Sequence, residues 1–310
     1  MTSISAVIPC YNGVEFLAKA IESALAQTRA VGEVIVVDDA STDGSTEVAA
    51  RYPVTLIRAS RNGGPARARN LGIRTSTGDV VAFLDADDWW EPGHCETVVA
   101  LLERFPEAGV AASAARFVGT REGRFTPHFP PGVPTDVFWQ ALRYAPIPQM
   151  ASVVRRSLLD EVGGYDEHLR RAQDFDLWIR LSRRTRFVCS HAETVRYRWH
   201  PAQLSTATLG SLTPMFESRR RMYETLIQER QLAIARRVRR EIWLRWLIEA
   251  TQAWRARDRA WMTRVLDLRA EVPQAPLPVR WLGRGAARGW STLPGGIRGW
   301  LRRRTGWPAP

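Results

Sequence analysis

The sequence predicts an α/β fold with a mostly parallel central sheet flanked by helices. Three observations lead to this class. Over the first 85 residues, four short apolar runs alternate with segments of helical pattern, an order typical of parallel strands joined by right-handed crossovers. The run at 80–84 is apolar throughout, as expected for a strand covered on both faces. Two of them end in paired acidic residues, which places charge at the carboxyl edge of the sheet, where such folds bind ligands.

The individual elements are predicted from local pattern. The strands are apolar or β-branched runs. The helices are indicated by amphipathic spacing, by the cap-like residues Ser41, Thr42 and Asp43, or by the paired glycines of "RNGGPARARNLG". In order, we predict a strand at 5–9, a turn at 11–13, a helix at 15–27, a strand at 33–39, a turn and helix within 40–52, a strand at 54–59, a helix within 61–77 and a strand at 80–84.

Acidic residues cluster where two of the predicted strands end. Asp38 and Asp39 follow one strand, and Asp85, Asp87 and Asp88 follow another. Because the carboxyl ends of parallel strands meet at one edge of the sheet, the two sets can face the same crevice. Carboxylates in this arrangement suit Mg²⁺ or Mn²⁺, which bridge one or two carboxylates to a diphosphate and would offset the repulsion between the acids. The alternative is a solvated turn that caps the next helix.

Composition and missing motifs exclude several other classes. No G-x-G-x-x-G follows the first strand and no P-loop sequence occurs, so neither a standard dinucleotide fold nor a P-loop enzyme is supported. No apolar run reaches the roughly 20 residues that a membrane-spanning helix needs. No basic leader precedes the first apolar residues, so we expect a cytoplasmic protein. The scattered Cys10, Cys95 and Cys189 indicate reduced, mostly buried thiols rather than a disulfide framework or a zinc site.

The basic charge of the chain lies almost entirely in its last hundred residues. The net charge is +12, while residues 211–310 alone contain 21 Arg against 8 acidic residues, so residues 1–210 are nearly neutral. Eight of the thirteen Trp residues are also in this last part. We therefore predict a catalytic domain at 1–210, a helical extension at 211–270 with a break near 229–235, and an Arg- and Trp-rich tail at 271–310.

Five motifs occur in a fixed order and carry a family resemblance. They are "AVIPCYNG", "VIVVDDASTDGS", "NGGPARARNLG", "VAFLDADDWWEPG" and "GGYDEHLRRAQDFDLWIRL". Together they resemble the family 2 glycosyltransferases, which have the GT-A fold, and the resemblance covers residues 3–205. It implies a nucleotide-sugar donor, a divalent metal, and single-displacement transfer with inversion at the sugar carbon.

The resemblance also implies roles for single residues of the donor site. Pro9 and Tyr11 would line the base pocket, with Tyr11 stacked on the base, and Asp39 would accept a hydrogen bond from it. Asn62 and Arg69 would help to hold the base or the phosphates. In the D-x-D motif, Asp85 would lie near the ribose and the metal, Asp87 would ligate the metal, and Asp88 would be structural. Trp89 and Trp90 are open between core packing and a wall for the sugar.

A candidate general base lies in "RAQDFDLWIRL". The family usually has Glu-Asp in this segment, and here the pair is Gln173-Asp174, so Asp174 is the predicted base, with a helix N-cap as the alternative. Asp176 is interpreted as a cap or structural acid.

His200 falls where many family members carry a His near the diphosphate or the metal, and it could complete the metal sphere, although a structural role is the alternative. Arg198 could contact phosphate or lie at the surface.

The C-terminal tail allows several interpretations. Basic residues mixed with Trp suit an anionic membrane surface, and the frequent Gly and Pro equally suit a disordered segment. Nucleic acid is the other usual partner of Arg-rich segments, but no nucleic-acid motif accompanies them, and we expect none to bind. Peripheral association with the inner face of the cell membrane and a disordered tail therefore both stay open as interpretations.

Together with these observations, the family resemblance implies a metal-dependent, inverting hexosyltransferase. We expect a sugar to move from a nucleotide-diphosphate donor, a UDP-sugar, to a hydroxyl of a glycan or lipid-linked glycan, as in cell-surface polysaccharide synthesis. One alternative is a nucleotidyltransferase, which would need a basic Gly-rich loop after the first strand that "IPCYNGVEF" is not. Another is a degenerate transferase domain acting as a membrane-associated scaffold. Gln173 leaves room for this alternative, whereas the D-x-D motif and Asp174 argue against it.

Overall fold

A computed structural model describes residues 1–200, 203, 209–256, 258–268 and 273. The chain divides into two compact units, Met1–Met215 and Phe216–Pro310. Each unit is described by itself. Most of the predicted tail at 271–310 lies outside the described residues, and so does its predicted membrane or disordered character.

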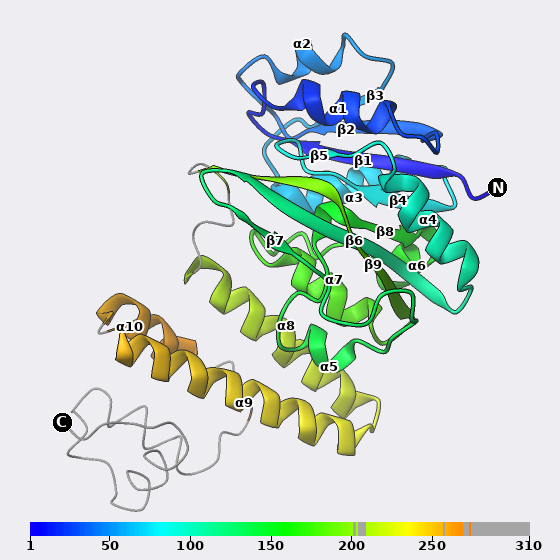
Figure 1. The fold of residues 1–310 in the computed structure, drawn as a ribbon. Helices are drawn as coiled ribbons and strands as arrows, with labels where there is room; N and C mark the ends of the chain where they lie inside the picture. Colours follow the sequence, from blue (N-terminus) through cyan, green and yellow to red (C-terminus); the bar gives the residue numbers. More distant parts are fainter. Residues whose placement is uncertain (201–202, 204–208, 257, 269–272, 274–310) are drawn as a thin grey trace, which may run out of the picture. The chain divides into compact units, whose positions relative to one another are not determined.

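The first half of the sheet has the predicted parallel arrangement (Figure 1). Its strands run in the order β3-β2-β1-β4, and each neighbouring pair is parallel. Helices alternate with them along the chain, so the βαβ prediction is confirmed. The elements are β1 (Ile4–Cys10), α1 (Leu17–Leu25), β2 (Glu33–Asp38), α2 (Ser45–Ala49), β3 (Thr55–Arg58), α3 (Pro65–Thr75) and β4 (Val80–Phe83).

Helices cover both faces of this half, which explains why its strands are apolar throughout. On β1, Ile4, Ala6 and Ile8 belong to one core cluster together with residues of α1 and α4. On β2, Ile35 and Val37 face the opposite way and pack with Ala68 of α3 in a second cluster. Side chains alternate between the two faces of a strand, so both faces of β1 and β2 carry buried apolar residues.

The second half makes the sheet mixed. The order continues from β4 through β8, β6 and β9 to β5, while β7 pairs with a later stretch of β6 than β8 does. β8 is antiparallel to both β4 and β6, and β6 is parallel to β9. The prediction of a mostly parallel sheet is confirmed, and the antiparallel pairs lie in this second half. The added elements are β5 (Trp89–Trp90), α4 (His94–Arg104), β6 (Ala108–Gly119), β7 (Gly123–Phe125), α5 (Phe138–Ala141), the 3₁₀ turn η1 (Gln149–Ala151), β8 (Ser152–Arg155), α6 (Arg156–Val162), α7 (Gln173–Leu181) and β9 (Arg186–Trp199).

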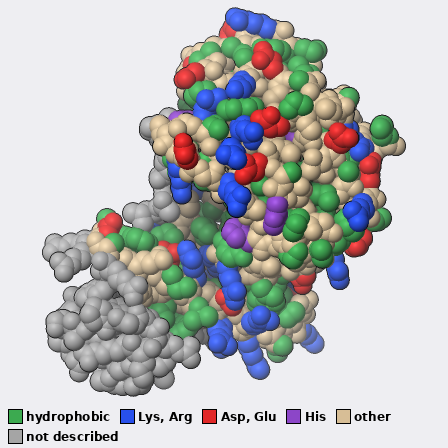
Figure 2. Space-filling view, viewed as in Figure 1, with side chains coloured by type: hydrophobic (Ala, Val, Ile, Leu, Met, Phe, Trp, Pro, Cys, Tyr) green, Lys and Arg blue, Asp and Glu red, His purple; other side chains and the backbone are tan. Residues whose placement is uncertain are grey.

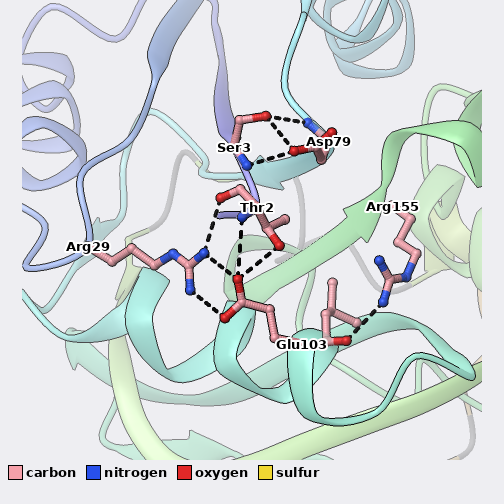
Figure 3. Close-up of polar contacts among 7 residues, drawn as sticks. Thr2, Ser3, Arg29, Asp79, Glu103 and Arg155 are labelled. Carbon is pink, nitrogen blue, oxygen red and sulfur yellow. Dashed lines mark hydrogen bonds and ion pairs between the residues drawn. The ribbon is translucent and has the colours of Figure 1, made fainter.

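A polar cluster fastens the start of the chain at the amino-terminal edge of the parallel strands (Figure 3). Glu103 on α4 accepts two hydrogen bonds from Arg29, at 2.6 and 2.9 Å, and one from the Thr2 hydroxyl at 2.9 Å. Next to it, Asp79 accepts from the amide and the hydroxyl of Ser3. This edge is opposite the one where the acidic strand ends lie, so the cluster stabilises the fold away from the candidate site.

The lowered pKa of Glu103 predicts that this residue makes a pH-dependent contribution to the stability of the fold. Hydrogen bonds from Arg29 and Thr2 lower its pKa from 4.5 to about 2 in the folded protein. A depressed carboxyl pKa adds stability above the unfolded value, and that stability is lost as the pH falls through the folded value. The side chain is 41% exposed, so screening limits the effect. We expect Glu103→Gln to cost about 0.5–1 kcal/mol at pH 7 and progressively less between pH 4.5 and 2.

Urea unfolding of the wild type and the variant at pH 7 and pH 3 measures this loss. Glu107→Gln, an exposed glutamate four residues along, is the matched control and is expected to change little at either pH. An equal loss in both variants, or a Glu103→Gln loss of the same size at both pH values, would contradict the prediction.

The second unit is helical. It contains the greater part of α8 (Leu209–Gln228), α9 (Leu232–Arg255) and α10 (Arg259–Asp267). The break between α8 and α9 falls at 229–231, where Arg230 has φ +58°, within the region that the sequence pattern predicts. Trp246 is fully buried and donates its indole N–H to the carbonyl of Val265 at 2.8 Å, which ties α9 to α10.

The surface of the helical unit is basic, and one arginine is buried within it. Figure 2 shows basic side chains along these helices on the face turned to the viewer. Arg219 is 1% exposed, and burial, reinforced by nearby Arg245, lowers its pKa to about 9. Arg245 pairs with the buried Glu249 at 2.5 Å, which places a compensating carboxylate in the same unit. Among the described residues, none of the helices combines the length and the apolar character that crossing a membrane requires.

Candidate active site

The acidic strand ends lie at the carboxyl edge of the parallel strands, on either side of β1. Asp38 ends β2, and Asp85 and Asp87 follow β4. β1 pairs with both strands, so the prediction that the two acidic sets leave the same edge of the sheet is confirmed. α3 starts after the neighbouring strand β3 and brings Arg69 to Asp85, with 2.5 Å between Nη2 and Oδ1.

Arg69 is the central cation of the site. It is 5% exposed, and its guanidinium lies 5.5 Å from the ring centroid of Tyr165. Burial lowers its pKa, but the charges of Asp85 and Tyr165 and the hydrogen bond to Asp85 together more than offset this, so the pKa stands above its ordinary value and the side chain stays charged. Asp174 also interacts electrostatically with Arg69, which brings the predicted base and the D-x-D segment into one charged cluster.

Asp87 is paired with His200. The distance between Asp87 Oδ2 and His200 Nε2 is 3.0 Å. Burial raises the pKa of Asp87, as does the charge of Asp85, while the hydrogen bond with His200 acts in the opposite direction. The sequence separates these two residues by more than a hundred positions, and β9 brings them together because it ends at Trp199, one residue before His200. The two predicted metal ligands therefore lie within reach of one ion.

This donor set suits a hard or borderline cation with open coordination positions. Asp87 and His200 would supply one oxygen and one nitrogen ligand, while one oxygen of Asp85 is already bonded to Arg69. In the part of the chain that the structure describes, no group of three or more His, Cys, Asp or Glu side chains forms a closed metal site. Mg²⁺ and Mn²⁺ usually keep positions for substrate phosphates and water, so two protein ligands fit them.

Asp88 holds the D-x-D turn to β9. It is 1% exposed and accepts a hydrogen bond from the backbone N–H of Arg198 at 2.7 Å. Burial raises its pKa well above the ordinary value, and the charges of Asp87 and Asp85 add to this. The Arg198 guanidinium donates to the carbonyl of Asp87 and lies over the ring of Phe16 at 4.6 Å. These contacts agree with the structural role predicted for Asp88.

The two tryptophans after the D-x-D motif have different surroundings. Trp90 is 2% exposed and donates its indole N–H to the carbonyl of Met150, so it belongs to the core. Trp89 is partly exposed, with Lys19 Nζ 3.5 Å and the Arg198 guanidinium 5.0 Å from its ring centroid. These contacts do not show that either tryptophan lines a binding site for the sugar.

Asp39 holds the loop before α3. Its two oxygens accept hydrogen bonds from the backbone N–H groups of Gly63 and Gly64, at 2.8 and 2.6 Å. Gly64 has φ +89°, a conformation that L side chains rarely adopt. Each carboxylate oxygen can accept a second hydrogen bond, so Asp39 keeps the capacity to bind a base N–H.

The other predicted donor residues line the same edge. Tyr11 follows β1 and is 53% exposed, so its ring is open to stacking. Pro9 lies on β1 beside Val37. The Asn62 side-chain oxygen accepts from Arg170 at 3.3 Å, so part of its hydrogen-bonding capacity is used within the protein.

Asp38 is a site residue to which the sequence assigned no role. It is 3% exposed, and its Oδ2 accepts from the N–H of Ser41 at 3.2 Å. Its Oδ1 is buried and has no hydrogen-bond partner among the described residues. A buried carboxylate oxygen without a partner is costly and indicates a group that binds there. The tandem acids of "VIVVDD" predict that Asp38 lies at this edge, but they give it no individual role.

Asp174 lies in the first turn of α7. The helix N-cap is Ala172, with φ +54°, so the N-cap alternative for Asp174 is wrong. Burial raises the pKa of Asp174. The N–H of Phe175 and the charge of Arg69 act against this shift, and the charge of Asp85 adds to it. A raised carboxyl pKa strengthens a general base. Asp176 pairs with Arg180 at 2.8 Å, which confirms a structural role for that acid.

The fold and the site together define a GT-A type glycosyltransferase. The family model "Glycosyl transferase family 2" matches residues 5–163, and the model "Glycosyltransferase like family 2" matches residues 136–241. The chain belongs to glycosyl transferase family 2.

Relatives support this membership. An uncharacterized glycosyltransferase of Haemophilus influenzae is 33% identical over 190 residues, which are 60% of this chain and 64% of that protein. The succinoglycan biosynthesis protein ExoU of Rhizobium meliloti is 32% identical, over 63% of either chain. The uncharacterized glycosyltransferase YwdF of Bacillus subtilis is 30% identical, over 67% of this chain and 79% of its own. The matched region therefore covers less than two thirds of the first two relatives.

Solved structures share the fold. Residues 1–349 of S. aureus TarS in complex with UDP-GlcNAc match with a TM-score of 0.67 and 18% identity, over 87% of this chain and 82% of that one. The mannosyltransferase PcManGT from Pyrobaculum calidifontis, in complex with GDP-Man and Mn²⁺, matches with a TM-score of 0.57 and 18% identity, over 96% and 83%.

Proposed function

We propose that this protein transfers a sugar from a nucleotide-diphosphate donor, a UDP-sugar, to a hydroxyl of a glycan or lipid-linked glycan in cell-surface polysaccharide synthesis. The observation that carries the proposal is the cluster of Asp85, Arg69 and Asp174, which three separate elements bring together beside the Asp87–His200 pair. Family membership supports transferase chemistry. The TarS complex with UDP-GlcNAc and the name of ExoU support the donor and the polysaccharide acceptor.

The proposed reaction is a single displacement. The acceptor hydroxyl oxygen forms a bond to the anomeric carbon of the donor sugar, on the face opposite the leaving group. The bond between that carbon and the diphosphate oxygen breaks, and the nucleoside diphosphate leaves with the electron pair. Asp174 takes the proton of the attacking hydroxyl. The configuration at the anomeric carbon is inverted because there is one displacement.

Asp87 and His200 are the residues proposed to hold the cation, which is Mn²⁺ or Mg²⁺. When bound, the ion supplies positive charge that stabilises the leaving diphosphate. Asp85 is proposed to lie near the ribose and the cation, with its orientation set by Arg69. The raised pKa of Asp87 fits a site whose carboxylates repel each other until a cation enters.

The nucleotide is proposed to bind at the edge formed by β1, β2 and the loop before α3. Tyr11 would stack on the base beside Pro9, and Asp39 would accept a base N–H while it keeps its hydrogen bonds to Gly63 and Gly64. Asn62 and Arg69 would hold the base or the phosphates. We further propose a cytoplasmic catalytic domain, at 1–210, that reaches the inner face of the membrane through residues 271–310.

A panel of donors tests the proposal. We expect UDP-GlcNAc or UDP-glucose to raise the melting temperature, and to raise it more with Mn²⁺ than with EDTA. GDP-mannose is expected to have little effect. A ligand present at about 100 times its Kd adds about 2.7 kcal/mol of stability, which a thermal-shift assay resolves as several degrees. A panel in which no nucleotide sugar shifts the protein, with or without Mn²⁺, would contradict the proposal and favour the scaffold alternative.

A further inference from the structure

The 3₁₀ turn η1 holds Gln149 rigidly beside the site. The carbonyl of Gln149 accepts from the hydroxyl of Ser152 at 2.7 Å. The carbonyl of the next residue, Met150, accepts the indole N–H of the buried Trp90 at 2.8 Å. The backbone of the turn is therefore anchored on both sides, and the position of the Gln149 side chain is set by the fold.

The amide of Gln149 is only partly satisfied. Its residue is 5% exposed, and its Nε2 donates to the hydroxyl of Tyr165 at 2.5 Å. Its Oε1 is buried and has no hydrogen-bond partner among the described residues. A glutamine amide can both donate and accept, so one end of this side chain is held by Tyr165 and the other end is available to a ligand.

Tyr165 connects this amide to the charged cluster. Its backbone N–H and carbonyl are both bonded to the side chain of Asn70 on α3, at 2.8 and 2.9 Å, and its ring packs edge-on against Phe83 of β4. Gly164 before it has φ +66°, and a Cβ there would come within 2.5 Å of the Asn70 oxygen. Tyr165 thus has little freedom, and its ring extends from Arg69 toward Gln149.

Unsatisfied donors lie at the Arg69 end of the same ring. Nη2 of Arg69 is bonded to Asp85, whereas its buried Nε and Nη1 have no hydrogen-bond partner within the described part of the chain. Buried polar groups are nearly always paired, so two donors and one acceptor left open in one rigid cluster indicate a polar ligand. A sugar fits, because each of its hydroxyls both donates and accepts.

We propose that Gln149 forms a hydrogen bond to a hydroxyl of the transferred sugar and is a residue that determines donor specificity. This inference rests on the proposed function and adds a contact on the sugar, away from the base and the diphosphate. Sites built to hydrogen-bond a hydroxyl discriminate strongly against analogues that lack it, because the protein group is then left unpaired. No sequence signal identified Gln149, since a single glutamine in a loop has no characteristic spacing.

The test compares Gln149→Met with the wild type. Methionine keeps the length of the side chain and removes its hydrogen-bonding atoms. With UDP-GlcNAc, UDP-glucose or GDP-mannose, whichever the wild type uses fastest, kcat/KM is expected to fall about 10- to 100-fold. The Kd for UDP alone is expected to stay within about twofold, because UDP lacks the transferred sugar. Gln252→Met, at an exposed position of α9, is the matched control and should leave both values unchanged.

Deoxy donors identify the hydroxyl. For the wild type, one monodeoxy analogue of the donor should lose about as much kcat/KM as the Gln149→Met substitution does. For the variant, the same analogue and the parent donor should react equally well, because the two changes remove the same contact. If Gln149→Met folds poorly, Gln149→Asn retains a polar amide but shortens the side chain, and the same selective loss is expected.

The outcomes separate this inference from the proposed function. If the wild type turns over a nucleotide sugar and Gln149→Met matches it, or if UDP binding falls as much as kcat/KM, the inference is wrong and the function stands. An unchanged kcat/KM would mean that an internal water satisfies the amide. If the wild type neither binds nor turns over any nucleotide sugar, both the function and the inference fall.

Discussion

Asp174→Asn is expected to reduce transfer by about 10²–10⁴-fold, the usual contribution of a positioned general base. Asparagine keeps the size of the side chain and cannot accept the proton of the acceptor hydroxyl. Donor binding should persist, because the base, the diphosphate and the cation are assigned to other residues. The measurement is the rate of transfer from the donor found in the thermal-shift panel, with Mn²⁺ present, together with the Kd for UDP.

The same substitution is expected to stabilise the protein at neutral pH. Burial raises the pKa of Asp174 above its ordinary value of 3.8 in the folded state. Between the unfolded pKa of 3.8 and the higher folded pKa, the folded protein binds more protons than the unfolded chain, so stability falls as the pH rises. Above the folded pKa the wild type therefore has the full loss of stability. An asparagine side chain at this position cannot ionise, so the variant should melt at a higher temperature at pH 7, and the difference should vanish below pH 3.8.

Asp176→Asn is the control on the same helix. Asp176 is paired with Arg180 and faces the core, so its substitution should lower the melting temperature and leave kcat close to wild type. If Asp174→Asn retained near wild-type turnover, or if both variants lost turnover equally, Asp174 would not be the base.

Asp87→Ala is expected to lower turnover by at least about 100-fold and to abolish the additional thermal shift that Mn²⁺ gives in the presence of UDP. Asp87 is the proposed oxygen ligand of the cation, and the diphosphate would lose the charge that stabilises its departure. The protein should remain folded, because Asp87 is a buried acid that is repelled by its neighbours Asp85 and Asp88. Its removal relieves this repulsion. Turnover and the thermal shift with Mn²⁺ or EDTA measure the two effects.

Two further variants sharpen this prediction. Asp160→Ala removes an exposed acid on α6 and should change neither turnover nor the Mn²⁺ shift. His200→Ala should weaken the Mn²⁺ shift, because it removes the partner of Asp87 at 3.0 Å. An Asp87→Ala protein that kept the wild-type Mn²⁺ shift would exclude Asp87 as the ligand, even if its turnover were low.

The parallel half of the fold could be predicted because its information is local. Continuous apolar runs such as 80–84 and glycine or cap residues between them mark β1, β2, β3 and β4 and the helices that join them. The order β3-β2-β1-β4 places both acidic strand ends at one edge, so the location of the site follows from the pattern as well. The direction of β8 does not follow, because an apolar run looks the same in a parallel and an antiparallel strand.

The amino-acid pattern alone was enough for the class of fold, the acidic edge, and, through five ordered motifs, the family with its implied donor site and base. Only the folded chain shows which of these residues contact one another. It paired Asp87 with His200, bonded Arg69 to Asp85 and assigned Asp88 to holding β9, and it left one buried atom each of Asp38 and Gln149 without a hydrogen-bond partner among the described residues. The physical reason is that strand and helix patterns arise from neighbours along the chain. Charge pairing and hydrogen-bond satisfaction depend on groups far apart in sequence, and packing alone sets their distances.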